Sequence, residues 1–125
     1  MNILNSLKHE VYNLMINDSA HDFDHIMRVF KNAKNICKHE NANEKLVLSA
    51  VLLHDIVSYA KSDKRSKLSS IRSAEKSKSI LKKFNFTKEE IRIISDAIRD
   101  HSFSSNKIPV TLEGKIQQDA DRLDA

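Results

Sequence analysis

Apolar side chains recur at intervals of three to four residues along most of this chain, which is the spacing of an amphipathic α-helix. Together with the capping residues, this pattern predicts six helices. Their expected limits are about 3–16, 23–39, 44–58, 68–84, 88–101 and 112–125. Turn-forming residues are scarce, since the 125 residues include one glycine and one proline. We therefore predict an all-α fold, a single-domain bundle of five to six helices over residues 1–125.

The same spacing predicts which positions face the core. The third helix, for which Asn43 is a suitable N-cap, is apolar nearly all round from Leu46 to Leu53 and is therefore expected at the centre. Thr87 and Glu90 have the spacing of a capping box at the start of the fifth helix. The inward positions expected for the first, second and fourth helices are Ile3, Leu7, Val11 and Leu14; Ile26, Val29, Phe30, Ala33 and Cys37 or Ile36; and Ile71, Ala74, Ser77 or Lys78, and Leu81.

Composition narrows the class of protein. Hydrophobic residues make up 40% and charged residues 30% of the chain, which is typical of a globular protein. The single cysteine, Cys37, cannot form an internal disulfide and is expected in the core rather than as a nucleophile. No signal peptide or membrane-spanning run is recognised, so a cytoplasmic location without membrane contact is expected. The formal charge of +4 suits an anionic substrate, although such a charge is also common on proteins that bind nothing acidic.

Two adjacent polar residues, His54 and Asp55, directly follow the most apolar helix. A polar side chain at the end of a buried helix is costly unless it is paired, and a divalent metal ion would satisfy both groups. A His-Asp pair exposed at a helix end is the alternative explanation. His25 is a further candidate ligand because it shares a helical stripe with Val29 and should point toward the core side.

Late in the chain, Asp119 and Asp121 offer a carboxylate, and their repeated spacing leaves the choice between them open. Imidazole and carboxylate ligands together suit one divalent ion among Mn, Fe, Co, Ni and Zn, or Mg where carboxylates dominate. The spacing shows only that suitable ligands exist on separate helices.

Four segments in order resemble the HD superfamily of metal-dependent phosphohydrolases. The first contains H-D-x-x-H-x-x-R-V and ends at Val29, and the second is L-L-H-D-I, ending at Ile56. The third begins at His101, and the fourth ends in Q-D-A-D-R-L-D-A at Ala125. The resemblance covers nearly the whole chain.

This resemblance implies that one divalent ion is held by His25, His54, Asp55 and Asp121, with His54 and Asp55 essential for catalysis. It also implies hydrolysis of a phosphate ester or anhydride by a metal-bound hydroxide, with a nucleotide or a related phosphorylated metabolite as the substrate. His101 is expected to line the site.

Cations that could hold phosphate oxygens include Arg28, and also Lys61 and Arg65, which follow the His-Asp pair closely. The charged stretch 61–67 is expected to be a loop, whereas the lysines from Lys76 onward are expected on a solvated helix face. Nucleic acid is not an expected partner, because few aromatic residues are interleaved with the basic ones.

Three departures from the family pattern qualify this expectation. Ser58 stands where many relatives carry an acidic residue, and residues 69–74 lack the additional histidines of two-metal relatives, which favours a single metal. The sequence also ends at Ala125, inside a segment after which relatives continue, so helices present in relatives are expected to be missing. A non-catalytic, regulatory module that binds metal or nucleotide is therefore the alternative function.

Overall fold

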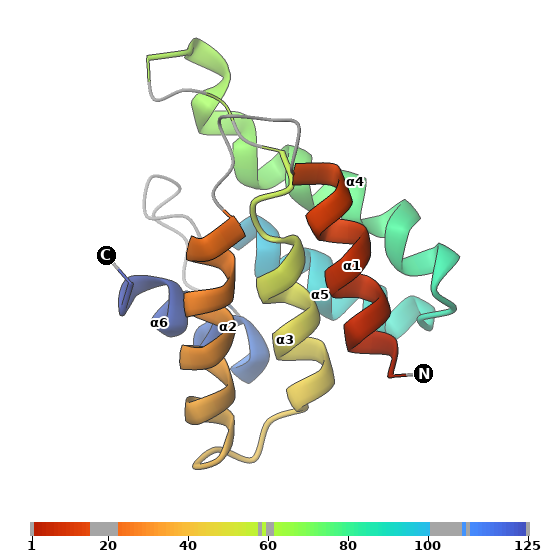
Figure 1. Cartoon of the computed structure of the whole chain (residues 1–125), viewed down its shortest axis with the longest axis vertical. Coiled ribbons are helices and arrows are strands. Elements are labelled where there is room, and N and C mark those ends of the chain that lie inside the picture. Colours follow the sequence, from red (N-terminus) through yellow and green to blue (C-terminus); the bar gives the residue numbers. More distant parts are fainter. Residues whose placement is uncertain are drawn as a thin grey trace.

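The computed structural model describes residues 2–15, 23–57, 59, 62–100, 109 and 111–124, with backbone only at 66 and 67. These residues form helices and no strand, so the all-α prediction is confirmed (Figure 1). None of the helices found among them is long and apolar enough to cross a membrane. The elements are α1 (Ile3–Met15), α2 (Phe23–Cys37), α3 (Glu44–Leu53), the 3-10 helix η1 (Lys64–Leu68), α4 (Ser69–Lys83), α5 (Lys88–Asp100) and α6 (Leu112–Arg122).

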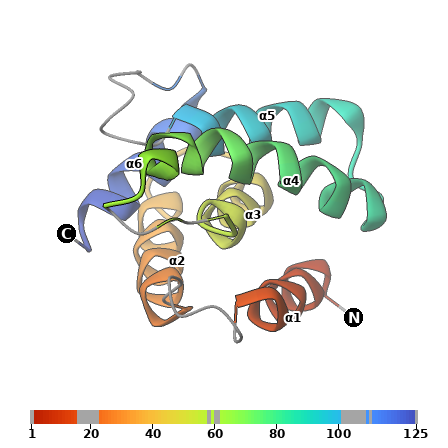
Figure 2. The same ribbon diagram turned by 90° about the horizontal axis from the view of Figure 1, so that it is seen from above.

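Helix α3 lies at the centre, as its sequence predicts. Every residue from Leu46 to Leu53 is buried, and α3 packs against all five of the other α-helices in the described part of the chain. Figure 2 shows α3 between α1 on one side and α4 and α5 on the other. Its N-terminus is capped by Asn43, whose side-chain oxygen accepts the Leu46 N–H at 3.3 Å.

The C-terminus of α3 differs from the expected limit of about Ser58, because the helix ends at Leu53. A tertiary contact accounts for the early end. The Ser73 hydroxyl accepts the Val57 N–H at 3.0 Å and donates to the Val57 carbonyl at 3.0 Å, so α4 satisfies backbone groups that a longer helix would have paired internally. The chain therefore turns directly after Leu53, at His54 and Asp55.

The predicted inward faces need two corrections. On α1, Leu14 is 38% exposed whereas Met15 is buried, and on α4, Ile71 is 42% exposed. The buried stripe of α4 consists mainly of small residues, and Ser77 satisfies its hydroxyl by donating to the Ser73 carbonyl at 2.7 Å. Of the two predicted alternatives, Ser77 is the buried one, and the buried Ser70 and Ser73 were not predicted. On α2, Ile26, Val29 and Ala33 are buried as predicted. Other expectations also differ: α2 ends at Cys37, α6 ends at Arg122 and not near Ala125, and part of the expected loop at 61–67 forms η1.

The junction between α4 and α5 is built from local signals. Asn85 has a φ of 65°, and the Phe86 N–H donates to the Leu81 carbonyl at 3.1 Å, which ends α4 in a left-handed turn without glycine. The predicted capping box of α5 is confirmed. The Glu90 N–H donates to Thr87 Oγ1 at 3.1 Å, and the Thr87 N–H donates to Glu90 Oε1 at 2.9 Å.

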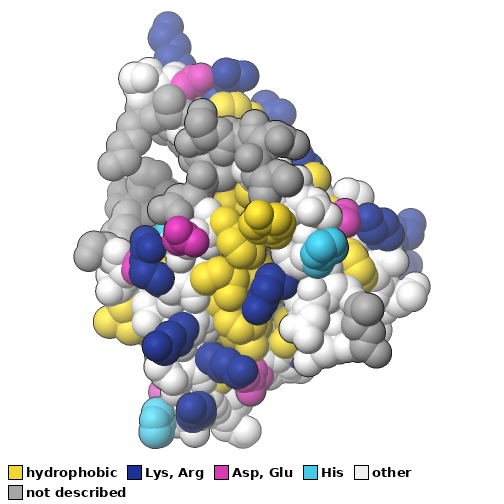
Figure 3. Space-filling model, viewed as in Figure 1, with side chains coloured by type: hydrophobic (Ala, Val, Ile, Leu, Met, Phe, Trp, Pro, Cys, Tyr) yellow, Lys and Arg dark blue, Asp and Glu magenta, His cyan; other side chains and the backbone are white. Residues whose placement is uncertain are grey.

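Helix α1 packs on α3. A strip of hydrophobic side chains beside α1 stays visible on the surface (Figure 3). The Tyr12 and Phe23 rings meet edge to face with their centroids 5.1 Å apart. Lys8 Nζ lies 5.1 Å from the centroid of the Phe30 ring, so a cation of α1 covers an aromatic residue of α2.

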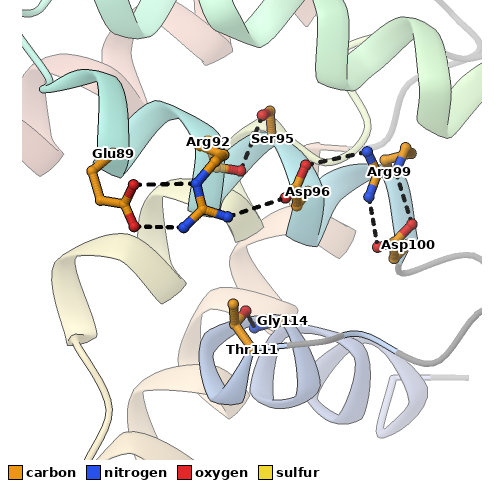
Figure 4. A network of polar contacts seen from close by, with 8 residues as sticks. All are labelled: Glu89, Arg92, Ser95, Asp96, Arg99, Asp100, Thr111 and Gly114. Atoms are coloured by element: carbon orange, nitrogen blue, oxygen red, sulfur yellow. Dashed lines mark hydrogen bonds and ion pairs between the residues drawn. The ribbon is translucent and has the colours of Figure 1, made fainter.

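Helix α6 is seated against α5 at its N-terminus. Thr111 Oγ1 accepts the Gly114 N–H at 3.0 Å and caps α6, while α5 carries a row of alternating charges from Glu89 to Asp100 above it (Figure 4). A Cβ atom at Gly114 would lie 2.9 Å from Pro109 Cβ and 3.5 Å from Ala97 Cβ. This position therefore needs glycine, and the close contact sets how α6 lies on α5.

Candidate metal centre

Side chains from three helices converge at one end of the bundle. His25 lies in the first turn of α2, His54 is the C-cap of α3, and Asp121 lies in the last turn of α6. One ligand atom of each residue lies within 4.8 Å of the others. Helices α2 and α6 pack against each other, with α6 crossing behind α2 in the view of Figure 1, and the Asn32 amide joins them by donating to the Ala120 carbonyl at 3.3 Å.

The three groups meet at one carboxylate oxygen. Asp121 Oδ1 is 3.1 Å from His25 Nε2 and 3.5 Å from His54 Nε2. The two imidazole rings are 5.9 Å apart between centroids, with an interplanar angle of 66°. Both histidines thus direct the same ring nitrogen, Nε2, toward the same small region.

The opposite nitrogen of each ring is engaged elsewhere. His54 Nδ1 lies 2.6 Å from the Val51 carbonyl oxygen, which can only accept, so Nδ1 carries the hydrogen. His25 Nδ1 lies 2.5 Å from Asp124 Oδ2. The Arg28 guanidinium and His25 hold the pKa of Asp124 below its usual range, so this ionised carboxylate accepts a hydrogen bond from His25 Nδ1. In the neutral form of each imidazole, Nε2 therefore keeps its lone pair for a metal ion.

The charges at the centre favour a cation. The hydrogen bond to Asp121 raises the pKa of His25 to about 9 against the lowering effect of burial, and Asp124 adds to the increase. Burial by itself lowers the pKa of His54, but the hydrogen bond to Asp121 and the charges of Asp121 and Asp55 outweigh it and raise the pKa. Positive charge is thus stabilised here, whether it comes from protons or from a bound ion.

The donor set fits a divalent ion. Two imidazole nitrogens and a carboxylate oxygen are ligand types that first-row transition metals prefer. The His54 side chain is 2% exposed, whereas those of His25 and Asp121 are 26% and 23% exposed. One wall of the centre is therefore buried, and the other is partly exposed to solvent.

The structure places only some of the predicted ligands in the group. Of the two candidate aspartates, Asp121 joins the group and Asp119 is exposed. Asp55 is half-buried and is not one of the three grouped residues, although its charge acts on His54. Its role as a fourth ligand stays a prediction.

Of the four predicted substrate contacts, the structure describes Arg28 and Arg65, and each of them contacts an aspartate. Arg28 Nε donates to Asp124 Oδ1 at 2.7 Å. Arg65 forms a two-point ion pair with Asp63 and lies 4.5 Å from the centroid of the Tyr59 ring. Lys61 and His101, like Ser58, lie outside the residues that the structure describes. The lysines from Lys76 onward on α4 are exposed, in agreement with a solvated face.

One functional candidate, Asp124, was missed by sequence reasoning. It lies three residues after Asp121, and side chains at that spacing share a face of a helix. This signal was available in the Q-D-A-D-R-L-D-A segment. Cys37 is half-buried, and burial, with the charges of Glu44 and Glu113, raises the pKa of its thiol, which agrees with an unreactive cysteine.

The fold and the site together indicate the class of protein. It is an all-α bundle in which His25, His54 and Asp121 converge and Asp55 directly follows His54. The HD domain family model matches residues 22–125, so the chain belongs to the HD domain family.

Several known proteins are similar to this chain. The uncharacterized protein YpgQ of Bacillus subtilis (strain 168) is 34% identical over 112 residues, which cover 86% of this chain and 52% of YpgQ. The crystal structure of a predicted HD superfamily hydrolase from an uncultured Thermotogales bacterium matches with a TM-score of 0.72 and 35% identity, over 98% of this chain and 66% of that one. The structure of YpgQ in complex with ADP matches with a TM-score of 0.70 and 30% identity, over 98% of this chain and 58% of YpgQ. The chain thus spans about half to two-thirds of the length of these relatives.

Proposed function

We propose that this protein is a metal-dependent phosphohydrolase that acts on a nucleotide or a related small phosphorylated metabolite. The observation that carries the proposal is the convergence of His25 Nε2, His54 Nε2 and an Asp121 carboxylate oxygen within 4.8 Å. Asp55 is proposed as the fourth ligand. A divalent ion held there would lower the pKa of a coordinated water and polarise a phosphoryl oxygen.

The residues around the ion have separate tasks in this proposal. Val51 and Asp124 keep the hydrogens of the two imidazoles on Nδ1, which leaves both Nε2 atoms available as ligands. The buried position of His54 keeps water away from one side of the centre. Lys61, Arg65 and His101 are proposed to contact the substrate, with cations stabilising charge on the phosphoryl group.

The choice of a nucleotide rests on a relative. YpgQ has been crystallised with ADP, and it matches 98% of this chain in structure. The shared fold, at 30% sequence identity, supports a nucleoside phosphate as the ligand of this protein too. Its formal charge of +4 is compatible with an anionic ligand.

One feature favours a second function, a regulatory module that binds metal or nucleotide without hydrolysis. Ser58 stands where an acidic residue is expected from the family resemblance. The two functions differ in a single observable, which is the release of phosphate.

The test is phosphate release from a panel of nucleoside mono-, di- and triphosphates, each with Mn, Mg, Fe, Co, Ni or Zn added. We expect release that depends on one of these metals and disappears in a variant combining His54→Ala and Asp55→Ala. The matched control combines His39→Ala and Glu40→Ala, because this pair is also a histidine next to an acid but is exposed. A wild type that binds metal and nucleotide but releases no phosphate would support the regulatory module instead.

A further inference from the structure

We infer that Asp124 is a positioning residue that holds the His25 imidazole in the orientation and tautomer needed for metal binding. The inference rests on the proposed metal centre and adds a residue that is not itself a ligand. It also gives Arg28 a task different from the substrate contact predicted for it.

The two oxygens of Asp124 have different partners. Oδ2 lies 2.5 Å from His25 Nδ1, and Oδ1 accepts a hydrogen bond from Arg28 Nε at 2.7 Å. The Asp124 side chain is 12% exposed, whereas that of Arg28 is 56% exposed. The guanidinium therefore covers the carboxylate from the solvent side, and the carboxylate in turn reaches the imidazole.

The position of this contact on the ring separates Asp124 from the ligands. It is made at Nδ1, whereas Nε2 of the same ring faces Asp121 at 3.1 Å. Asp124 is not among the three grouped residues with metal-binding potential. A carboxylate that accepts from the far nitrogen of a ligating histidine fixes the ring and makes the ligating nitrogen more basic.

The two histidines differ in how firmly the fold holds their rings. His54 is buried, and a backbone carbonyl, that of Val51, accepts from its Nδ1. His25 sits in the first turn of α2 with 26% of its side chain exposed, so packing restrains it less. The restraint comes from Asp124, a charged side chain in the turn just after α6, and it links the start of α2 to the end of α6.

The experiment measures the binding of Mn²⁺ alone by calorimetry, without substrate. We expect Asp124→Ala to weaken Mn²⁺ binding by about 10- to 100-fold, the range seen when such outer partners are removed. Asp124→Asn should restore part of the loss, because its amide oxygen can still accept from His25 but carries no charge. The matched controls are Asp119→Ala and Asp119→Asn, which change an exposed aspartate five residues earlier, in α6, and should bind as the wild type does.

Arg28 is tested through a double-mutant cycle. We expect Arg28→Gln to weaken Mn²⁺ binding by less than Asp124→Ala does, and to have almost no further effect in the Asp124→Ala background, because it acts through Asp124. A residue that only contacted phosphate would leave Mn²⁺ binding unchanged in the absence of substrate.

A spectroscopic readout separates positioning from ligation. In the Co²⁺-loaded protein, the visible absorption bands of Asp124→Asn should keep the wild-type positions, because the ligands are unchanged. Shifted bands would make Asp124 a ligand and overturn the inference, as would Mn²⁺ binding by Asp124→Ala within twofold of the wild type. Equal effects of Arg28→Gln in both backgrounds would overturn the task given to Arg28. A wild type that binds none of these ions would overturn the proposed function itself.

Discussion

Asp121 Oδ1 lies 3.1 Å from His25 Nε2, although the two residues are 96 positions apart in the chain. The contact exists because α6 packs against α2 in the register that the Asn32–Ala120 hydrogen bond marks. His54 reaches the same oxygen from the end of the central helix. The candidate metal centre is therefore a product of the packing of three helices, and we expect changes to any of the three to alter its geometry.

Replacement of Asp121 should remove most of the metal. We expect Asp121→Asn to lower the metal content of purified protein and to weaken Mn²⁺ binding by more than about 100-fold, since the loss of a ligand exceeds the loss of an outer partner. Elemental analysis and calorimetry measure both effects. Asp119→Asn is the control, because Asp119 is exposed on the same helix. If Asp119→Asn lost metal and Asp121→Asn kept it, the ligand would have been assigned to the wrong residue.

The cations after the His-Asp pair should act on substrate rather than on metal. We expect Lys61→Ala and Arg65→Ala to lower kcat/KM by roughly 10- to 1000-fold, as befits a lost charge-assisted contact. Their Mn²⁺ binding should be unchanged. Steady-state kinetics on the nucleotide identified by the panel provide the measurement.

The control for these two variants is Lys76→Ala, which removes an exposed cation of α4. Normal kinetics in both Lys61→Ala and Arg65→Ala would contradict their substrate-binding role and leave the proposed metal chemistry unaffected.

Asp55→Ala should abolish turnover, and full activity in that variant would contradict the proposed mechanism.

Gly114→Ala should destabilise the fold, although alanine is the better helix former. The new Cβ would lie 2.9 Å from Pro109 Cβ and 3.2 Å from Thr111 Oγ1, so α6 would have to shift. Overpacking of this kind costs about 1–3 kcal/mol, which exceeds the gain of about 1 kcal/mol in helix propensity. Urea unfolding measures the difference, with Lys115→Ala at the exposed neighbouring position as the control. A more stable Gly114→Ala protein would show that the contact relaxes freely.

Gln117→Met should stabilise the fold. The Gln117 side chain is fully buried, and neither its nitrogen nor its oxygen has a hydrogen-bond partner in the described part of the chain. An unsatisfied buried polar group costs about 1–3 kcal/mol, and methionine fills a similar volume without that penalty. The control is Gln118→Met, because Gln118 Nε2 donates to the Asp100 carbonyl at 3.5 Å and that bond would be lost. A large loss of stability in Gln117→Met would mean that a bound water or ligand satisfies the amide.

Local features of this chain were predictable from its sequence. The six helices and the capping box of Thr87 and Glu90 follow from periodicity and from side chains that bond to nearby backbone. The central place of α3 follows from its nearly uniform apolar composition. The residue types needed for a metal centre were also visible, because imidazole and carboxylate chemistry does not depend on the fold.

Other features were decided only when the helices packed. Asp121 rather than Asp119 turns toward His25, and Asp124 contacts the opposite nitrogen of that ring. Helix α3 stops at Leu53 because Ser73 of α4 satisfies the backbone beyond it. The physical reason is the same in each case. The sequence of a helix does not by itself fix the rotation of the helix about its axis or the residue at which it ends, because the alternatives differ little in energy. Contacts with other helices decide between these alternatives.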